Sequence, residues 1–335
     1  MRSDRFLRCF LGAMLSLALF YGRSGAQQPA APPSATPSAA SAAGLPAPGA
    51  FAPGVLTVIP PDVDRGDALS VHELVEVRAN QGLQWDPSAM SKSRTLYEMA
   101  ASVAFPQDVY CLELAFKPLR MIEVDVPQPN GRLQRKLVWY MVYRVRNTGV
   151  GLSAEIKPDG TYVTAAKGQE PVRFIPEFVL VSHDRARGER VRKAYLDRIV
   201  PTALTAIRAR ELPDGQLLPS TELPLHELRI EAGRAEQGLW GVAMWSDVDP
   251  QIDFFSVYVR GLTNAYRWTD VAGEFKLGDP PGAGRQFTFK TLQLNFWRPG
   301  DELDQDEREI RFGVAAGRAE FYDSPEGVAY RWVYR

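Results

Sequence analysis

The chain contains few of the residues on which disulfides, zinc sites and thiol chemistry depend. Its 335 residues include two cysteines and three histidines. Cys9 lies within an N-terminal segment that has the composition of a secretory leader, so Cys111 would be the one thiol of the mature protein. An intramolecular disulfide is then excluded, and a zinc site of cysteine and histidine is not expected. Cys111 stands in an apolar, strand-like run, which predicts a buried thiol and not a nucleophile.

Common catalytic motifs are also missing. The sequence has no Gly-x-Ser-x-Gly elbow, no Ser-x-x-Lys pair, no phosphate loop that ends in Gly-Lys-Ser/Thr, and no Gly-x-Gly-x-x-Gly after a strand. Lysine and arginine number 39 against 40 aspartate and glutamate, so no overall charge favours nucleic acid or an anionic membrane. We therefore expect a protein that is not an enzyme and does not bind nucleic acid.

The N-terminus predicts export. Arg2, Arg5 and Arg8 precede an apolar run over residues 10–21, and Ser24-Gly25-Ala26 offers small residues for a signal peptidase. We assign residues 1–26 to a signal peptide, with an uncleaved anchor as the alternative. No later run is long and apolar enough to span a membrane, so the mature chain is expected in the periplasm or cell envelope.

Residues 27–54 form a linker that cannot build a core. They are almost wholly alanine, proline, serine and glycine and carry no charge. Such a composition predicts a disordered, locally extended segment. It serves either as a tether that holds the folded part at a distance or as a neutral spacer.

A first β region is predicted over residues 55–185. The run 137–149 has the densest concentration of β-branched and aromatic residues in the chain, and both of its faces begin apolar, as in a strand covered on both sides. Asn130-Gly131 is the strongest hairpin signal in the chain, so this run should return antiparallel to the one before it. Arg144 and Arg146 are expected where the strand reaches water.

The pattern over residues 187–211 changes to a helical period, and a second β region follows over 221–335. Val191, Tyr195 and Ile199 fall on one side of a helix that Pro201 would kink or split. Residues 186–220 are thus predicted to be a helix and connector. The fold class is mainly β, with two antiparallel immunoglobulin-like β-sandwich regions joined by this amphipathic helix.

Clustered carboxylates are the strongest candidates for a metal site. Asp247, Asp249 and Asp253 are spaced like oxygen ligands for Ca²⁺, although the EF-hand pattern is not met. They form either a calcium site or a capped turn. Asp301 and Glu302 begin an acidic run over 301–309, which is either a hydrated loop or a surface for a cation or a basic partner.

Four tryptophans offer a different binding surface. Exposed aromatic rings in a row would suit a carbohydrate, as on lectin-like sandwiches, whereas core packing is the common role of tryptophan. The candidates are Trp240, Trp245, Trp268 and Trp297.

The C-terminal region resembles a group of exported proteins. The segments 245–266, which begins Trp-Ser-Asp-Val-Asp-Pro-Gln-Ile-Asp, and 292–302, which begins Leu-Gln-Leu-Asn-Phe-Trp, are similar to segments of β-rich exported proteins of planctomycete type. No activity is assigned to that group, so the resemblance implies secretion and β structure and names no site. The sequence as a whole predicts an exported, non-catalytic β protein with a structural or protein-recognition role in the cell envelope. The alternative is a carbohydrate- or calcium-binding module, and a hydrolase comes after it; the partner would be an envelope protein or polysaccharide.

Overall fold

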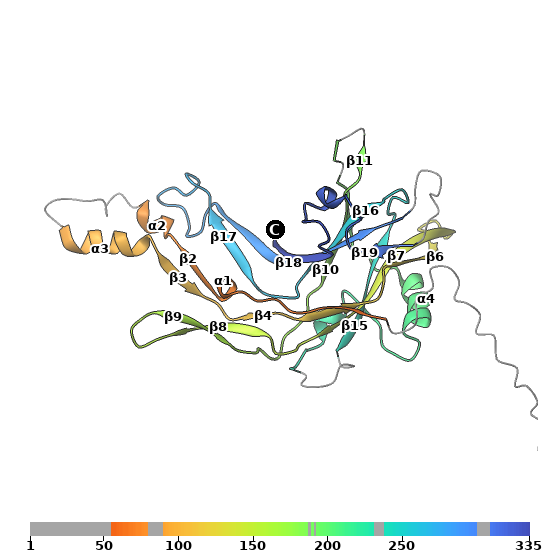
Figure 1. The fold of residues 1–335 in the computed structure, drawn as a ribbon, viewed down its shortest axis with the longest axis horizontal. Helices are drawn as coiled ribbons and strands as arrows, with labels where there is room; N and C mark the ends of the chain where they lie inside the picture. The colour runs from red at the N-terminus through yellow and green to blue at the C-terminus, as the bar shows by residue number, and fades with distance from the viewer. Residues whose placement is uncertain (1–54, 80–89, 187–188, 191, 231–237, 300–308) are drawn as a thin grey trace, which may run out of the picture. The chain divides into compact units, whose positions relative to one another are not determined.

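The protein is mainly β, and its strands form two large sheets (Figure 1). The computed structural model describes residues 55–79, 90–186, 189–190, 192–230, 238–299 and 309–335. The predicted signal peptide (1–26), the predicted linker (27–54) and the acidic residues Asp301 and Glu302 lie outside these residues. No helix of the described part is long and apolar enough to cross a membrane.

The first sheet is organised around β7 (Leu133–Arg146). β15 (Leu239–Ser246) runs antiparallel along one edge of β7, while β6 (Arg120–Pro127) and β5 (Glu113–Phe116) share the other edge. β1 (Thr57–Ile59) extends the sheet beyond β5, and β14 (Leu218–Pro219) extends it beyond β15. The prediction of a hairpin at Asn130-Gly131 is confirmed, because β6 pairs with β7 down to Pro127 and Leu133. Gly131 has a φ of 76°, which glycine adopts without strain.

The second sheet is organised around β18 (Arg285–Trp297). β16 (Phe254–Arg260) and β17 (Tyr266–Asp270) pair with successive halves of this long strand. β10 (Glu177–Ser182) and β13 (Ala194–Leu196) continue the sheet beyond β16. The remaining partners of β18 are β19 (Arg311–Phe312) and β20 (Tyr330–Tyr334).

One hydrophobic core fills the space between the two sheets. Trp139 of β7 packs edge-on against Phe255 of β16, with ring centroids 5.4 Å apart. Strands from both predicted β regions contribute to each sheet, since β7 pairs with β15 and β10 pairs with β16. The division into separate sandwiches over 55–185 and 221–335 is therefore wrong. Neither region buries its apolar face alone, and periodicity within one strand does not show which distant strand it will pair with.

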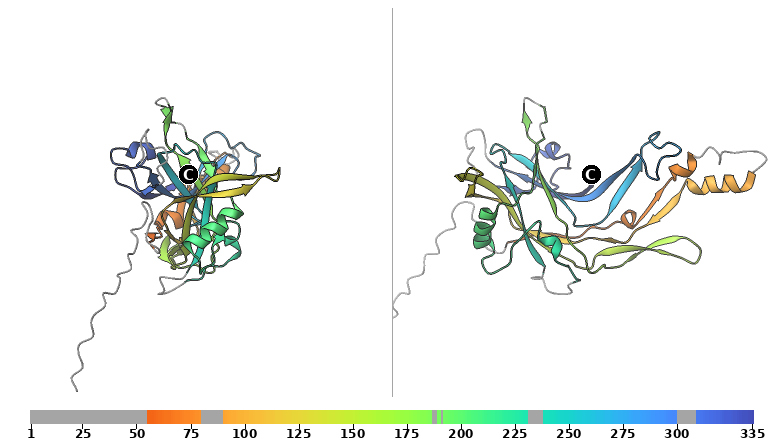
Figure 2. Two further views of the ribbon diagram at one scale, coloured as in Figure 1. Left: turned by 90° about the vertical axis from the view of Figure 1, so that its right-hand side faces the viewer. Right: turned by 180° about the vertical axis from the view of Figure 1, so that it is seen from behind.

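The back of the first sheet is covered by α4 (Pro201–Glu211). Val138, Tyr140 and Val142 of β7 form a second cluster with Ala203 and Ile207 of this helix. The further ribbon views show the helix beside the β6–β7 hairpin (Figure 2). This explains why both faces of β7 are apolar. Polar residues at its end are not all in water, however. Arg144 is buried and lies over the ring of Trp240, so the expectation of solvent contact there is wrong.

The predicted helix over 187–211 is shorter than expected. It begins at Pro201, whose missing N–H and fixed φ suit the first turn of a helix. The residues before it include β13, whose Tyr195 pairs opposite Leu180 and packs against the main core. Of the apolar residues that suggested a helix there, Tyr195 lies in this strand, Ile199 lies between the strand and α4, and Val191 is outside the described residues.

Smaller elements complete the described chain. α1 (Arg65–Ala68) precedes β2 (Leu69–His72) in the chain, and α2 (Val75–Arg78) follows it. β2 pairs with β3 (Val103–Pro106), which comes after α3 (Met90–Ala100) in the sequence. The others are β4 (Val109–Tyr110), β8 (Gly151–Ile156), β9 (Tyr162–Ala166), β11 (Arg185–Ala186), β12 (Glu189–Arg190), and two 3-10 helices, η2 (Leu223–Leu225) and η3 (Ala319–Tyr322).

Candidate functional site

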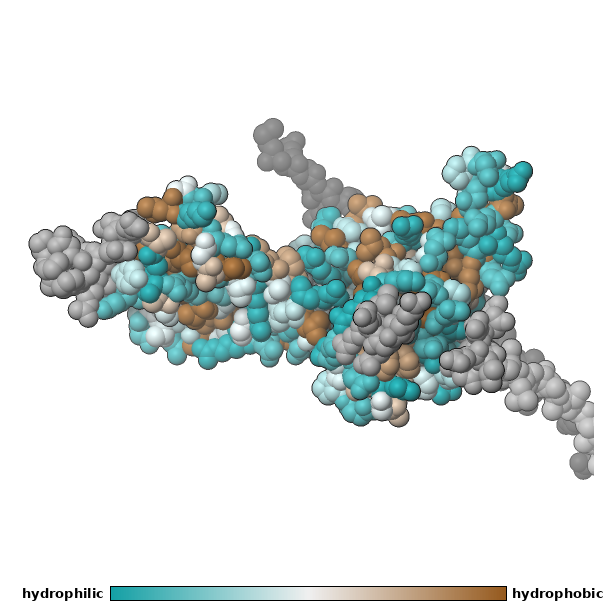
Figure 3. Space-filling view, turned by 90° about the horizontal axis from the view of Figure 1, so that it is seen from above, coloured by the Kyte–Doolittle hydropathy of each residue, from teal (hydrophilic) through white to brown (hydrophobic). Residues whose placement is uncertain are grey.

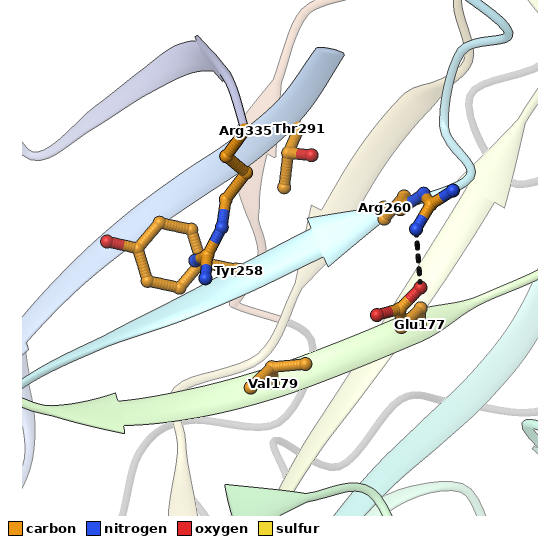
Figure 4. Close-up of a pocket in the computed structure, with 6 residues that line it drawn as sticks. All are labelled: Glu177, Val179, Tyr258, Arg260, Thr291 and Arg335. Atoms are coloured by element: carbon orange, nitrogen blue, oxygen red, sulfur yellow. Dashed lines mark hydrogen bonds and ion pairs between the residues drawn. The ribbon is translucent and has the colours of Figure 1, made fainter. Parts of the chain in front are cut away.

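A groove lies on the outer face of the second sheet. Side chains alternate along a strand, so Val257 and Val259 of β16 enter the core while Tyr258 and Arg260 point outward. Two adjoining cavities of about 580 and 180 Å³ open on this face, and both are lined by Glu177 and Arg260. The smaller cavity is lined by Glu177, Val179, Tyr258, Arg260, Thr291 and Arg335 (Figure 4).

Aromatic rings hold two arginines of the groove in place. The guanidinium carbon of Arg335 lies 3.9 Å from the centroid of Tyr258, and that of Arg260 lies 3.8 Å from the centroid of Phe289. Arg260 of β16 also donates a hydrogen bond of 3.2 Å to Glu177, which lies opposite it on β10, and this contact is exposed to solvent. Figure 4 shows Arg335 lying across the Tyr258 ring. No carboxylate side chain of the described residues forms an ion pair with Arg335, so the smaller cavity holds a guanidinium that is oriented by its contact with Tyr258.

The larger cavity has a more apolar wall. Tyr110, Ile175, Pro176 and Phe289 are among the residues that line it. Gly261 permits its shape, because a Cβ there would lie 2.0 Å from the carbonyl oxygen of Ile175, and its φ of 95° disfavours other residues. Asn264 accepts a hydrogen bond from the Tyr110 amide at 3.0 Å and donates to the Asp108 carbonyl at 2.9 Å. This side of the groove is therefore held by hydrogen bonds before any ligand arrives.

Two of the three aspartates predicted as calcium ligands are directed at separate lysines. Asp247 accepts from Lys136 at 2.9 Å and Asp249 accepts from Lys193 at 3.0 Å, and each of these hydrogen bonds lowers the pKa of its carboxyl group. Burial raises the pKa of Asp253. Among the described residues no group of three or more acidic, histidine or cysteine side chains is placed to hold a metal ion. The structure does not bring the three aspartates together, and calcium binding stays a prediction.

The four tryptophans do not form a row. Trp245 is fully buried in the main core, whereas Trp240 lies on the opposite face of β15 near Arg144 and Lys117. Trp268 is stacked on His72, with ring centroids 3.9 Å apart. Trp268 pairs opposite Phe287, and Trp297 lies ten residues further along β18, or about 33 Å away. A shared carbohydrate platform of these four side chains is not what the structure shows.

A buried serine and histidine contact each other beneath η3. His183 Nε2 and Ser256 Oγ are 2.8 Å apart, and both residues are buried. The Ser256 hydroxyl donates its one proton to Asn295 Oδ1 at 2.8 Å. His183 must then donate to the serine oxygen, which is the reverse of the direction in which a histidine activates a nucleophile. The pair has the geometry of a structural network.

Cys111 is fully buried, as predicted, and burial raises the pKa of its thiol to about 12. We expect a Cys9→Ser chain to show no reaction with a thiol reagent such as dithiobis(nitrobenzoate) in native buffer at pH 8. The same chain should release one thiol in denaturant, because the thiolate is the reacting form and the fold both hides and disfavours it. Stoichiometric reaction within minutes in native buffer would place Cys111 at the surface.

The sequence alone did not single out the residues of the groove. Tyr258 and Arg260 alternate with the apolar Phe255, Val257 and Val259, and this alternation is the one signal that marks them as outward-facing. Arg335 joins them only because β20 lies beside β18.

The face shown in Figure 3 is polar over most of its area, with hydrophobic residues in small groups. Comparisons with protein-family models, curated proteins and solved structures find no match to this chain.

Proposed function

We propose that the protein is an exported, non-catalytic component of the cell envelope that binds a partner molecule in the groove on its second sheet. The observation that carries the proposal is the Arg335 guanidinium, which is fixed over Tyr258 and lacks an ion-pair partner among the described residues. A cation oriented in a cavity before binding loses little side-chain freedom when a ligand arrives. The immunoglobulin-like type of the sandwich and the envelope location belong to this proposal.

The geometry of the groove supports recognition more than reaction. Its lining combines apolar side chains with a few polar ones, which is usual for binding sites. The ionisable groups of the smaller cavity are two arginines, one glutamate and Tyr258, whose pKa burial raises even though Arg335 opposes the rise. Glu177 is paired with Arg260. These groups can orient a ligand by charge and stacking, and they include no activated nucleophile.

Two exposed isoleucines give a matched test of this proposal. Ile175 lines the larger cavity and is 67% exposed, and Ile156 of β8 lies outside both cavities and is 66% exposed. We expect the wild-type chain to sediment with envelopes isolated from the bacterium that makes it. Ile175→Glu should weaken that binding at least tenfold, and Ile156→Glu should change it less than twofold.

Both substitutions place the same charge at an equally exposed position, so neither should alter folding. Circular dichroism and the melting temperature would confirm this. Equal binding by the two variants would show that the partner does not bind in the groove. Failure of the wild-type chain to sediment would contradict a recognition role in the envelope.

A further inference from the structure

We infer that the ligand of this groove is an acidic polysaccharide, whose carboxylates contact Arg335 and Arg260 and whose sugar rings face Tyr110 and lie beside the arginine-covered rings of Tyr258 and Phe289. The inference rests on the proposed function and names the class of partner for the same site.

The charge of the groove favours an anion. Arg335 has one face of its guanidinium on Tyr258, which leaves the N–H groups at its edge to meet a planar carboxylate with two parallel hydrogen bonds. Arg260 already binds Glu177 at 3.2 Å, but this pair is exposed, and exposed pairs are weak. A carboxylate of the ligand can therefore share Arg260 or displace Glu177 from it.

The position of the groove favours a saccharide over an acidic peptide. An extended peptide usually binds along a free strand edge, where it gains backbone hydrogen bonds. The strands that form the floor of this groove, β10, β16 and β18, each have a hydrogen-bonded strand on both sides, whereas β20, at whose end Arg335 lies, pairs with β18 alone among the described strands. A ligand on the floor of the groove is then bound by side chains that project from the face of the sheet.

Three aromatic side chains lie among the residues that line the two cavities. Tyr258 and Phe289 each carry a stacked arginine, and Tyr110 lines the larger cavity together with Phe289. Sugar rings present apolar C–H faces to aromatic rings, whereas aspartate and glutamate side chains have no comparable face. Rings and cations in one groove thus fit a polymer that combines sugar rings with carboxylates.

The test compares three polymers with the purified full-length chain by isothermal titration calorimetry. Polygalacturonate carries both sugar rings and carboxylates, its fully methyl-esterified form carries the rings without charge, and poly-L-glutamate carries the charge on a peptide. We expect binding to polygalacturonate that weakens as salt rises, because salt screens exposed charges. The other two polymers should bind at least tenfold more weakly.

Arginine variants locate the binding. Arg335→Ala should weaken binding to polygalacturonate at least tenfold, and Arg335→Lys should recover only part of it, because lysine keeps the charge and loses the planar stack. Arg135→Ala is the control, since it removes the same charge from an exposed residue of β7. Its affinity should stay within twofold of wild type.

Several results would overturn the inference. Equal binding of poly-L-glutamate would make the ligand an acidic peptide, and equal binding of the esterified polymer would show that charge is not recognised. Equal losses of affinity in Arg335→Ala and Arg135→Ala would mean that the polymer is attracted by the overall positive charge and not bound at a specific site. If no polymer binds while the chain still sediments with envelopes through Ile175, the ligand class is wrong and the proposed function stands.

Discussion

Replacing Trp139 with alanine should lower the free energy of unfolding by about 3–5 kcal/mol. The side chain is fully buried on the central strand of the first sheet and meets Phe255 of the second sheet at 5.4 Å. Its loss removes contacts that join the two sheets and leaves a cavity where both must pack. Urea unfolding followed by circular dichroism at pH 7 measures the change.

Leu133→Ala provides the control within the same strand. Leu133 is 67% exposed, so its truncation should change the free energy of unfolding by less than about 0.5 kcal/mol. A loss below about 1 kcal/mol for Trp139→Ala would show that the interface between the sheets is not the centre of the fold.

Removing the charge of Lys290 should cost a similar amount, about 3–5 kcal/mol, because a buried carboxylate loses its nearer cation and keeps only the half-exposed guanidinium of Arg267 at 3.8 Å. Lys290 Nζ lies 2.7 Å from Asp67 Oδ2 and 2.9 Å from the Asp62 carbonyl oxygen, and both charged side chains are almost fully buried. Tyr334 donates a further hydrogen bond to Asp67. We expect Lys290→Met to show this loss in urea unfolding at pH 7.

Asp67→Asn combined with Lys290→Met should be more stable than Lys290→Met alone, because the double variant buries no unpaired charge. Equal stability of the single and double variants would mean that the cost comes from packing and not from charge.

The pair also sets an expected pH dependence. Burial would raise the pKa of Asp67, but hydrogen bonds from the Asp64 backbone, Lys290 and Tyr334 outweigh it and hold the pKa below its ordinary value of 3.8. The stability that this carboxylate contributes is then present above about pH 4 and lost as pH falls through the lowered pKa. The pKa of Lys290 is raised above 10.5 because Asp67 outweighs its burial, so its contribution is lost only in strong alkali.

Strands and turns of the fold were predictable from local pattern, and their partners were not. The apolar run around Trp139 predicted a strand that is covered on both faces, and Asn130-Gly131 predicted the turn before it. Pairing of β7 with β15, about a hundred residues later, depends on which apolar faces fit together, and no local period records that. The prediction of a helix before Pro201 was wrong for a related reason. A short strand that buries Tyr195 can place apolar residues at a spacing that also fits one face of a helix.

The candidate site was beyond local pattern as well. Asp247 and Asp249 are close in sequence, yet Lys136 of β7 and Lys193, which directly precedes β13, bind them separately. The groove residues come from β10, β16, β18 and the end of β20, so their meeting is a property of sheet order. Clusters of tryptophans or carboxylates can be recognised in a sequence. Arginines that stack on aromatic rings of other strands cannot, because the two partners are far apart in the chain.

Hydrogen exchange in the presence of polygalacturonate tests the central claim most directly. If the polymer lies in the groove, amides of residues 173–177 and 260–264 at the wall of the larger cavity, and of β20, should exchange at least severalfold more slowly when it is bound. Amides of the β8–β9 hairpin should not change. Slower exchange confined to residues 247–253, or to the surroundings of Trp240, would contradict recognition through this groove.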